Sequence, residues 1–276
     1  MNPRPLAVAD WLAAGQRPPC LDLRSAAEFA GGHLPGAGNL PLAELAARGH
    51  ELPRRGTALY LVGGELAAAG ARALVARGRW ELAVSLEPPA AWPAAALVRD
   101  APAPLWSPNP WLAEHWLRLP PGGRVLDLAM GSGRNAVWLA RQGLRVEGLD
   151  ILPEAVAMAA ALARRHGVAL TARVGDARAP ESLAPGDWDG IVVIDFLERA
   201  LLARLPAALA PGGVLVYETF TRAQAAAGGK PRSPQHLFEG GELERAFAGE
   251  LELLAYREGE PEPGRQVASL VARRPH

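Results

Sequence analysis

A glycine-rich turn in the second half of the chain sets the strongest limit on what this sequence can fold into. Residues 125–140 read VLDLAMGSGRNAVWLA, a short apolar run followed by two closely spaced glycines and a helix-forming segment. The spacing Gly131-x-Gly133-x-x-Ala136 fits the dinucleotide fingerprint G-x-G-x-x-[GA], in which a strand leads through a tight turn into a helix. The turn therefore predicts a buried parallel strand, with a ligand bound where the helix begins.

The remainder of the second half alternates between apolar runs and amphipathic segments. We expect strands at residues 124–129, 145–150, 169–174, 189–195 and 213–218, and helices at 134–142, 153–166 and 198–210. Strands that alternate with helices form a doubly wound sheet, whose ligands bind at the carboxyl ends of the strands. After residue 218 the pattern predicts a loop at 221–237, a helix near 241–248, and strands near 251–257 and 266–273 that form an antiparallel hairpin at the sheet edge.

The first half of the chain predicts a smaller α/β unit. Short strands are expected at 20–23, 57–62 and 81–86, with a helical turn at 26–29 and a helix at 67–77. This succession of strands and helices indicates a second parallel sheet. Five prolines then interrupt residues 88–104, which excludes a continuous helix or a central strand there. We therefore expect a first domain at 1–98, a proline-rich linker at 99–104 and a second domain at 105–276.

The composition excludes several classes of partner and site. The 276 residues include 29 Arg and Lys and 29 Asp and Glu, so a net charge of zero gives no electrostatic reason to expect nucleic acid or an anionic membrane as a partner. A single cysteine excludes an internal disulfide and a Cys-based zinc site, and no metal is expected. No apolar run approaches the ~20 residues of a membrane span, and no signal peptide is evident, so we expect a cytoplasmic protein.

Asp127 decides which ligand the glycine turn favours. A dinucleotide places its pyrophosphate on the helix N-terminus, where a neighbouring carboxylate would repel it. S-adenosylmethionine has no phosphate, and its methionine arm carries an ammonium group that a carboxylate attracts. Asp150 lies 19 residues after Gly131, placed to accept hydrogen bonds from ribose hydroxyls, which both ligands have. Asp127 therefore favours S-adenosylmethionine and disfavours an NAD-linked oxidoreductase, which stays the rival interpretation.

Asp176 follows the third expected strand of the second half, in the run Val174-Gly-Asp-Ala177. Two roles fit this place equally well. The carboxylate can receive the amino group of adenine, or it can cap a helix or close an Asx turn through its own backbone.

At several separated points, residues 105–273 resemble the class I S-adenosylmethionine-dependent methyltransferases. Their sequence motifs are most similar to those of the tellurite-resistance type. The shared runs are LDLAMGSGRNAVWLA, GLDILPEAV, LAPGGVLVYETFT and FEGGEL. The resemblance implies a Rossmann-like doubly wound sheet, S-adenosyl-L-methionine as cofactor and methyl transfer to an acceptor. Met130 stands where that family often has a smaller residue, and we expect its side chain to pack beneath the cofactor. The cofactor-binding residues implied are Asp127, Ala129, Gly131, Gly133, Asn135, Asp150, Ile151, Asp176, Ala177 and Asp195.

The acceptor side of the site needs positioning more than acid–base chemistry, because a sulfonium is already an activated methyl donor. The candidate positions are the end of the fourth strand and the two later runs 217–222 and 230–236, and the residues singled out are Asp195, Phe196, Arg222, Arg232 and His236. Segment 221–237 is long and broken by prolines, which is typical of a lid, and its basic groups suit a small anionic acceptor such as a chalcogen oxyanion, a thiol compound or a carboxylate. A solvated surface loop is the alternative.

The tryptophan-rich segment before the first strand of the second half has two readings. Trp106 and Trp111 would shield the sulfonium from water, as the family resemblance implies, or Trp111 and Trp116 would form the core face of an amphipathic helix, which the spacing favours. His115 is expected to be exposed.

The first half resembles a rhodanese-like domain over residues 5–93, through the run 21–41 and the closing segment 84–93. Rhodanese chemistry requires a cysteine thiolate in the loop after the strand at 57–62, and that loop reads Gly-Gly-Glu-Leu at 63–66. Cys20 begins a different strand and is expected to be buried. The resemblance implies that Asp22, Arg24 and His33 belong to the structural signature of the family. We expect this half to be a catalytically inactive module that docks a protein partner, regulates the second half or covers its site.

Two alternatives to a small-molecule methyltransferase remain open on the sequence. One is a protein that senses S-adenosylmethionine without turnover. The other is a methyltransferase of a macromolecule such as tRNA or a protein, against which the balanced charge of the chain argues.

Overall fold

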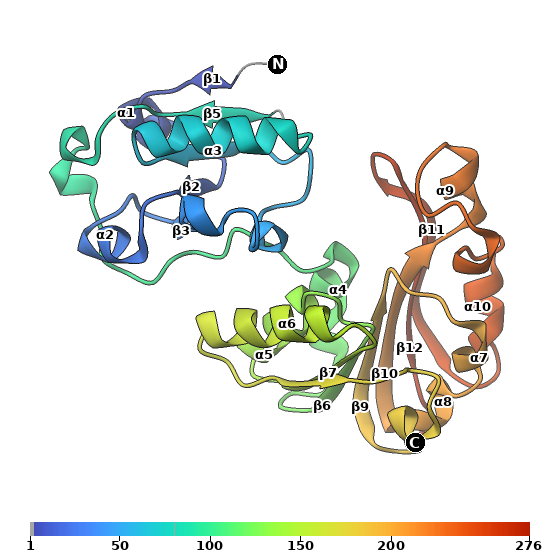
Figure 1. Cartoon of the computed structure of the whole chain (residues 1–276). Coiled ribbons are helices and arrows are strands. Elements are labelled where there is room, and N and C mark those ends of the chain that lie inside the picture. The colour runs from blue at the N-terminus through green and yellow to red at the C-terminus, as the bar shows by residue number, and fades with distance from the viewer. Residues whose placement is uncertain (1–2, 80) are drawn as a thin grey trace. The chain divides into compact units, whose positions relative to one another are not determined.

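The chain folds into two units that divide between Ser107 and Pro108. The computed structural model describes residues 3–79 and 81–276, and Figure 1 colours the chain from blue at its N-terminus to red at its C-terminus. Each unit contains its own sheet and its own apolar core. The two predicted α/β halves are therefore both present.

The predicted linker at 99–104 belongs to the first unit. The backbone N–H of Ala103 donates to the carbonyl of Ala37 at 3.0 Å, and Leu105 packs with the buried leucines of that unit. Because Leu105 buries its side chain there, the observed division falls three residues after the start at 105 that the sequence predicted.

The first unit is built on a five-stranded parallel sheet with the strand order β1-β5-β4-β2-β3. Its strands are β1 (Arg4–Pro5), β2 (Cys20–Asp22), β3 (Ala37–Asn39), β4 (Leu59–Val62) and β5 (Leu82–Val84). Its α-helices are α1 (Val8–Ala13), α2 (Ala26–Gly31) and α3 (Glu65–Ala76). The sequence did not predict β1 and β3, because strands of two or three residues are too short to show an apolar pattern.

Buried polar residues hold together the strand ends and turns of this first unit. Arg24 binds both carboxylate oxygens of Asp22 through Nε and Nη2, and Nη2 also donates to the carbonyl of Gly32 at 2.9 Å. The guanidinium lies 4.5 Å from the ring centroid of Trp92. His33 is fully buried and pairs with Asp100 at 2.7 Å. These contacts hold strand ends and turns together, as the predicted structural signature requires.

The second unit is built on a seven-stranded sheet with the strand order β11-β12-β10-β9-β6-β7-β8. Its strands are β6 (Arg124–Leu128), β7 (Arg145–Asp150), β8 (Thr171–Val174), β9 (Trp188–Ile194), β10 (Leu209–Phe220), β11 (Glu252–Glu262) and β12 (Arg265–Arg273). Strands β6 to β10 are parallel, and the antiparallel hairpin β11–β12 extends the sheet beyond β10. The strand order reverses between β6 and β9, and this is where a doubly wound sheet binds its ligand.

Helices cover both faces of this sheet (Figure 1). They are α4 (Pro110–His115), α5 (Arg134–Arg141), α6 (Pro153–Arg165), α7 (Arg199–Leu202), α8 (Leu205–Ala208), α9 (Arg222–Ala226) and α10 (Glu242–Phe247). The single helix predicted at 198–210 is wrong, because Pro206 has no backbone N–H and its ring clashes with the preceding turn, which leaves two short helices. The continuous loop predicted at 221–237 is also wrong, since it contains α9.

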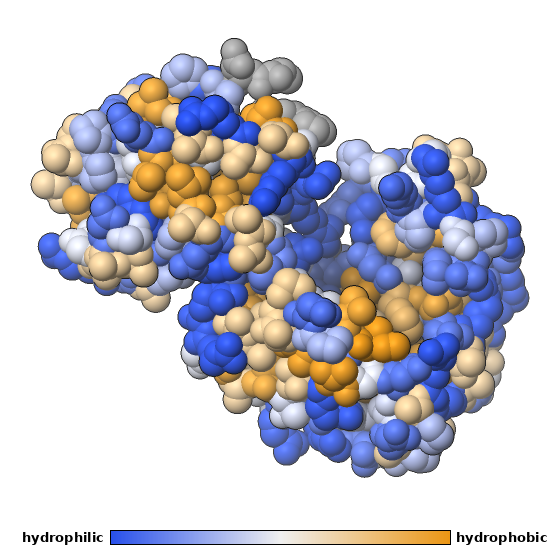
Figure 2. All heavy atoms as spheres, viewed as in Figure 1, coloured by the Kyte–Doolittle hydropathy of each residue, from blue (hydrophilic) through white to orange (hydrophobic). Residues whose placement is uncertain are grey.

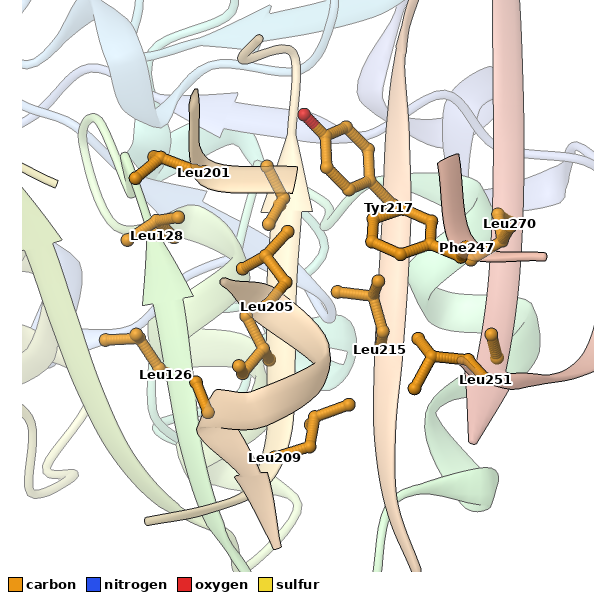
Figure 3. Close-up of a cluster of buried hydrophobic side chains, with 14 of the residues drawn as sticks. Leu126, Leu128, Leu201, Leu205, Leu209, Leu215, Tyr217, Phe247, Leu251 and Leu270 are labelled. Atoms are coloured by element: carbon orange, nitrogen blue, oxygen red, sulfur yellow. The ribbon is translucent and has the colours of Figure 1, made fainter. Parts of the chain in front are cut away.

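Two apolar layers fix these helices on the sheet. Leucines of α7 and α8 pack with Phe247 of α10 against the strands, and Figure 3 shows their side chains meeting in one layer. The labelled members are Leu126, Leu128, Leu201, Leu205, Leu209, Leu215, Tyr217, Phe247, Leu251 and Leu270. Helices α4 and α5 pack on the strands in a second layer. Because both faces are covered, β9 and β10 carry the unbroken apolar runs 191–194 and 214–217.

Helix α4 settles the two readings of the tryptophan-rich segment. Trp111 is 4 % exposed and belongs to the second apolar layer, with Trp116 packed against it. The core interpretation is confirmed for Trp111, whereas Trp116 begins the short 3-10 helix after α4 and is only partly buried. The expectation that His115 is exposed was wrong, because its ring is buried and lies 4.0 Å from the ring of Trp111, edge to face.

Candidate functional site

The glycine turn connects β6 to α5 through left-handed backbone. Ala129, Gly131 and Gly133 have φ angles of 58°, 55° and 79°. A Cβ atom on Gly133 would lie 2.5 Å from Cβ of Ala159 in α6, so only glycine lets the two helices approach this closely. Around Gly131 no atom would contact an added Cβ, which leaves open space beside the turn.

Asp150, at the end of β7, braces this turn. Its Oδ2 accepts a hydrogen bond from the backbone N–H of Gly131 at 2.8 Å, and its Oδ1 accepts one from Leu152 at 2.9 Å. A carboxylate oxygen can accept two hydrogen bonds, so each oxygen keeps capacity for a ligand hydroxyl. The residue lines the cavity described below.

Asp127 is a buried carboxyl group with an unused oxygen. The residue is 1 % exposed, and its Oδ2 has no hydrogen-bond partner among the residues that the structure describes. Burial is the main cause that raises the pKa of Asp127 to about 7, opposed by the backbone N–H of Ala136 and assisted by the charge of Asp150. Because an unpaired buried polar atom is costly, this oxygen points to a missing ligand group.

A cavity of about 330 Å³ opens at the carboxyl ends of β6, β7 and β9 and after β8. It is lined by Ala129, Leu149, Asp150, Ile151, Gly175, Asp176, Ala177, Arg178, Phe196 and Glu198. Ile151, Leu152 and Val174 are each more than half exposed, and Figure 2 shows apolar side chains on the surface of this unit beside α6. The cavity is thus an apolar hollow with a few polar groups, as small-molecule sites usually are.

Asp176 adopts the geometry of the Asx turn. Its Oδ1 accepts the backbone N–H of Arg178 at 2.9 Å, and its Oδ2 binds Nη2 of Arg178 at 2.7 Å. These hydrogen bonds from Arg178 lower the pKa of Asp176. The carboxylate nevertheless lines the cavity, so contact with an adenine amino group stays a prediction.

The structure brings the predicted residues Ala129, Asp150, Ile151, Asp176, Ala177 and Phe196 together around the cavity. The other predicted cofactor residues, Asp127, Gly131, Gly133, Asn135 and Asp195, are not among those that line the cavity. Asn135 accepts the backbone N–H of Asn109 at 2.8 Å. Asp195 binds Arg265 at 2.8 Å, with a left-handed φ of 57°. Met130 packs on β7, because its sulfur occupies the space where a Cβ on Gly148 would lie.

Three basic side chains of segment 221–237 have local partners. Arg222 pairs with Glu239 at 2.6 Å, and Arg232 donates to two carbonyls of its own loop. The ring of His236 contacts the side chain of Gln235 at 3.0 Å. These three residues are not among those that line the cavity. Their geometry is that of a hydrogen-bonded surface segment, and the lid stays a hypothesis.

Glu218 was expected only as a member of the candidate run 217–222, and its buried ion pairs were not predicted. It is 1 % exposed near the end of β10 and binds both Arg257 and Arg265. The available signal was an acidic residue inside the apolar run Val214–Phe220, where a charge is costly unless it is paired.

In the first unit, the position of a rhodanese nucleophile lies between β4 and α3. Only Gly63 and Gly64 separate the two elements, and Glu65 begins the helix. Cys20, the single cysteine of the sequence, is 1 % exposed on β2, and burial raises the pKa of its thiol. This buried thiol lies on another strand and differs from the accessible, low-pKa thiolate that reactive cysteines use.

Comparison with known proteins agrees with this division of the chain. Residues 7–87 match the rhodanese-like domain family, and residues 125–213 match the family of methyltransferase domains. A ubiquinone biosynthesis O-methyltransferase of Xanthomonas campestris is 32 % identical over 111 residues, which cover 38 % of this chain and 46 % of that protein. A ribosomal protein L11 methyltransferase of Thermus thermophilus is 34 % identical over 153 residues, or 52 % of this chain and 55 % of that protein.

The chain thus spans about half the length of the curated relatives that it matches. A solved structure of a SAM-dependent methyltransferase from Methanosarcina mazei is 21 % identical, with a TM-score of 0.50 over 61 % of this chain and 99 % of that one. This likeness shows a shared fold. No helix of the described residues is long and apolar enough to cross a membrane. The chain therefore joins a rhodanese-like domain to a methyltransferase domain with a Rossmann-like sheet.

Proposed function

We propose that the second unit binds S-adenosylmethionine and transfers its methyl group to a small-molecule acceptor. The observation that carries the proposal is the buried, unpartnered Oδ2 of Asp127 behind the glycine turn. An ammonium group satisfies such an oxygen, whereas a pyrophosphate would be repelled. The matched domain family and the names of the two relatives support methyl transfer as the reaction.

The residues of the site have separate tasks in this proposal. Asp150 holds the ribose hydroxyls with the lone pairs that its backbone partners leave free. Leu149, Ala177 and Phe196 line the cavity with apolar surface and exclude water. S-adenosylmethionine, when bound, supplies a methyl group activated by its sulfonium, so the protein needs to position the acceptor and does not need a strong base.

The acceptor class is the finer part of the proposal. The relative from Xanthomonas is named for O-methylation in ubiquinone biosynthesis, which supports a small acceptor with a hydroxyl group. The resemblance to the tellurite-resistance type supports a thiol or a chalcogen oxyanion. The relative from Thermus is named for a ribosomal protein, and this keeps a protein acceptor as the second candidate.

We assign the first unit no chemistry of its own. The single cysteine is buried on β2, and the nucleophile position holds two glycines before α3. A rhodanese-like unit without a thiolate still offers a folded surface, so we propose that it docks a protein partner.

The test begins with cofactor binding to the purified full-length chain. Calorimetric titration with S-adenosylmethionine and with NAD is expected to show binding of the first ligand alone. Binding of NAD without S-adenosylmethionine would overturn the proposal in favour of an oxidoreductase.

Transfer is then measured with S-adenosylmethionine that carries a tritiated methyl group. The acceptors are dithiothreitol, catechol, tellurite and a small carboxylate, beside ribosomal protein L11 as a protein acceptor. We expect label in at least one of the small molecules. Binding without transfer to any acceptor would instead indicate a sensing protein, and label in L11 alone would favour the second candidate.

A further inference from the structure

Glu218 is a buried carboxylate that the proposed cofactor site does not use. Four side chains donate to it: Asn109 at 2.7 Å, Ser269 at 2.7 Å, Arg257 at 3.2 Å and Arg265 at 3.0 Å. Replacing a buried ion pair by apolar side chains of similar volume is often neutral or stabilising. Packing alone therefore does not account for a carboxylate at this position.

The carboxyl group of Glu218 is ionised in the folded protein. Burial by itself raises its pKa, but the hydrogen bonds from Asn109 and Ser269, together with the charge of Arg265, outweigh burial and hold the pKa below its usual value. The bonds are therefore charge-assisted, which makes them stronger than bonds between neutral groups.

On the acceptor side, Glu218 holds Asp195 in two ways. Nη2 of Arg265 binds Oε1 of Glu218 at 3.0 Å and Oδ1 of Asp195 at 2.8 Å. The backbone N–H of Asp195 also donates to the carbonyl of Glu218 at 2.8 Å. The φ of 57° at Asp195 is strained for a residue with a side chain and persists only when its surroundings enforce it. The next residue, Phe196, lines the cavity.

On the cofactor side, Glu218 is joined to the first turn of α5. The side chain of Asn109 donates to Glu218, while its Oδ1 caps α4 by accepting the N–H of Leu112 at 3.0 Å. The backbone N–H of Asn109 donates to Asn135, which follows the glycine turn directly. Glu218 is thus connected to both sides of the cavity through residues that are far apart in sequence.

We infer that Glu218 is a positioning residue for methyl transfer, which acts through Arg265 to fix Asp195 and Phe196 where the acceptor lies. This inference rests on the proposed function. Since a displacement of about 1 Å can cost on the order of 100-fold in rate, loosening this network should slow transfer without removing any group that touches the cofactor.

The variant Glu218→Gln tests the inference in the full-length chain. Glutamine keeps an oxygen for Asn109 but loses the charge that binds Arg265. We expect kcat to fall roughly tenfold or more with whichever of dithiothreitol, catechol, tellurite or the small carboxylate the wild type methylates. The affinity for S-adenosylhomocysteine, measured by calorimetry, should stay at the wild-type value. Arg265→Met should lower kcat equally, and the double variant should lose no more than either single variant.

Arg273→Met is the matched control, because Arg273 lies on the same strand and pairs only weakly with the exposed Glu252, at 3.7 Å. It should turn over like the wild type. If thermal unfolding shows that Glu218→Gln does not fold, Arg265→Met, at the more exposed partner, carries the test alone.

Three results would overturn the inference while the proposed function stands. They are a wild-type kcat in Glu218→Gln or in Arg265→Met, losses that add in the double variant, and a loss of S-adenosylhomocysteine affinity that matches the loss of rate. A wild type that methylates none of the four small acceptors would instead remove the small-molecule function, and the inference with it.

Discussion

The backbone N–H of Gly131 donates a hydrogen bond to Oδ2 of Asp150 at 2.8 Å. The carboxylate at the end of one strand thereby fixes the turn that follows its neighbour. This bond joins the two halves of the proposed cofactor site before any ligand is bound, so the site is built in advance and less ordering is needed on binding.

Replacing Asp150 with alanine should weaken binding of S-adenosylmethionine by about 1–3 kcal/mol, the usual range for a lost hydrogen-bonded charged partner. The variant removes a partner of the ribose and also the brace on the glycine turn. Calorimetry measures the affinity, and Glu154→Ala, at an exposed residue of α6, is the control. An unchanged affinity would remove Asp150 from the site.

Asp127 should make the stability of the free protein depend on pH. Its pKa is raised from 3.8 to about 7 by burial, so between these values the folded state holds a proton that the unfolded state has lost. The stability contributed by this proton is fully present below pH 3.8 and is lost as pH rises through about 7, at ~1.4 kcal/mol for each pKa unit. Asp127→Asn should remove this dependence.

Urea unfolding of both proteins at several pH values between about 4 and 8 checks this prediction. The difference in free energy of unfolding between Asp127→Asn and the wild type should grow with pH. A constant difference would mean that Asp127 is already ionised in the folded protein at low pH.

The two glycines of the turn should differ in their tolerance of alanine. Both have positive φ, which costs roughly 1–2 kcal/mol for a residue with a side chain. A Cβ on Gly133 would also collide with Ala159 at 2.5 Å, whereas Gly131 has open space. Gly133→Ala should therefore lower the free energy of unfolding by about 1–3 kcal/mol more than Gly131→Ala. Equal losses in thermal or urea unfolding would show that α5 and α6 can move apart without cost.

The protein should lack thiosulfate sulfurtransferase activity. Cys20 is buried, and the residues between β4 and α3 contain no thiol. Formation of thiocyanate from thiosulfate and cyanide should stay at the background level. Activity above background that Cys20→Ser abolishes would contradict the structural position of this thiol.

The sequence predicted those parts of the fold that depend on local pattern. Strands β6 and β7 and helices α5 and α6 agree with prediction to within a residue or so, because each has a clear apolar repeat and a glycine or proline at its boundary. The single helix expected at 198–210 does not form, and Pro206 is the local reason, because proline in a helix interior removes a backbone hydrogen bond.

The contacts of the site were harder to predict than its strands. Asp150 and Asp176 both line the cavity, because strand ends of a parallel sheet meet at one edge, and their contacts with a cofactor stay a prediction. The contacts of Glu218 join residues 109, 218 and 265, and no spacing rule in one sequence relates positions so far apart. His115 was misplaced for a similar reason, since its burial depends on the ring of Trp111 and on the strands beneath.

The antiparallel pairing of β12 with β10 affects the order in which the sheet can form during synthesis. Strands β6 to β10 can pair as they leave the ribosome, but Arg265 is made 47 residues after Glu218. Until then, the second edge of β10 lacks its neighbour and the carboxylate lacks this guanidinium partner. A nascent chain that ends before β12 would therefore expose an unpaired strand edge, which is prone to aggregation. The second unit can complete its sheet only after the hairpin has been synthesised, however early its glycine turn has formed.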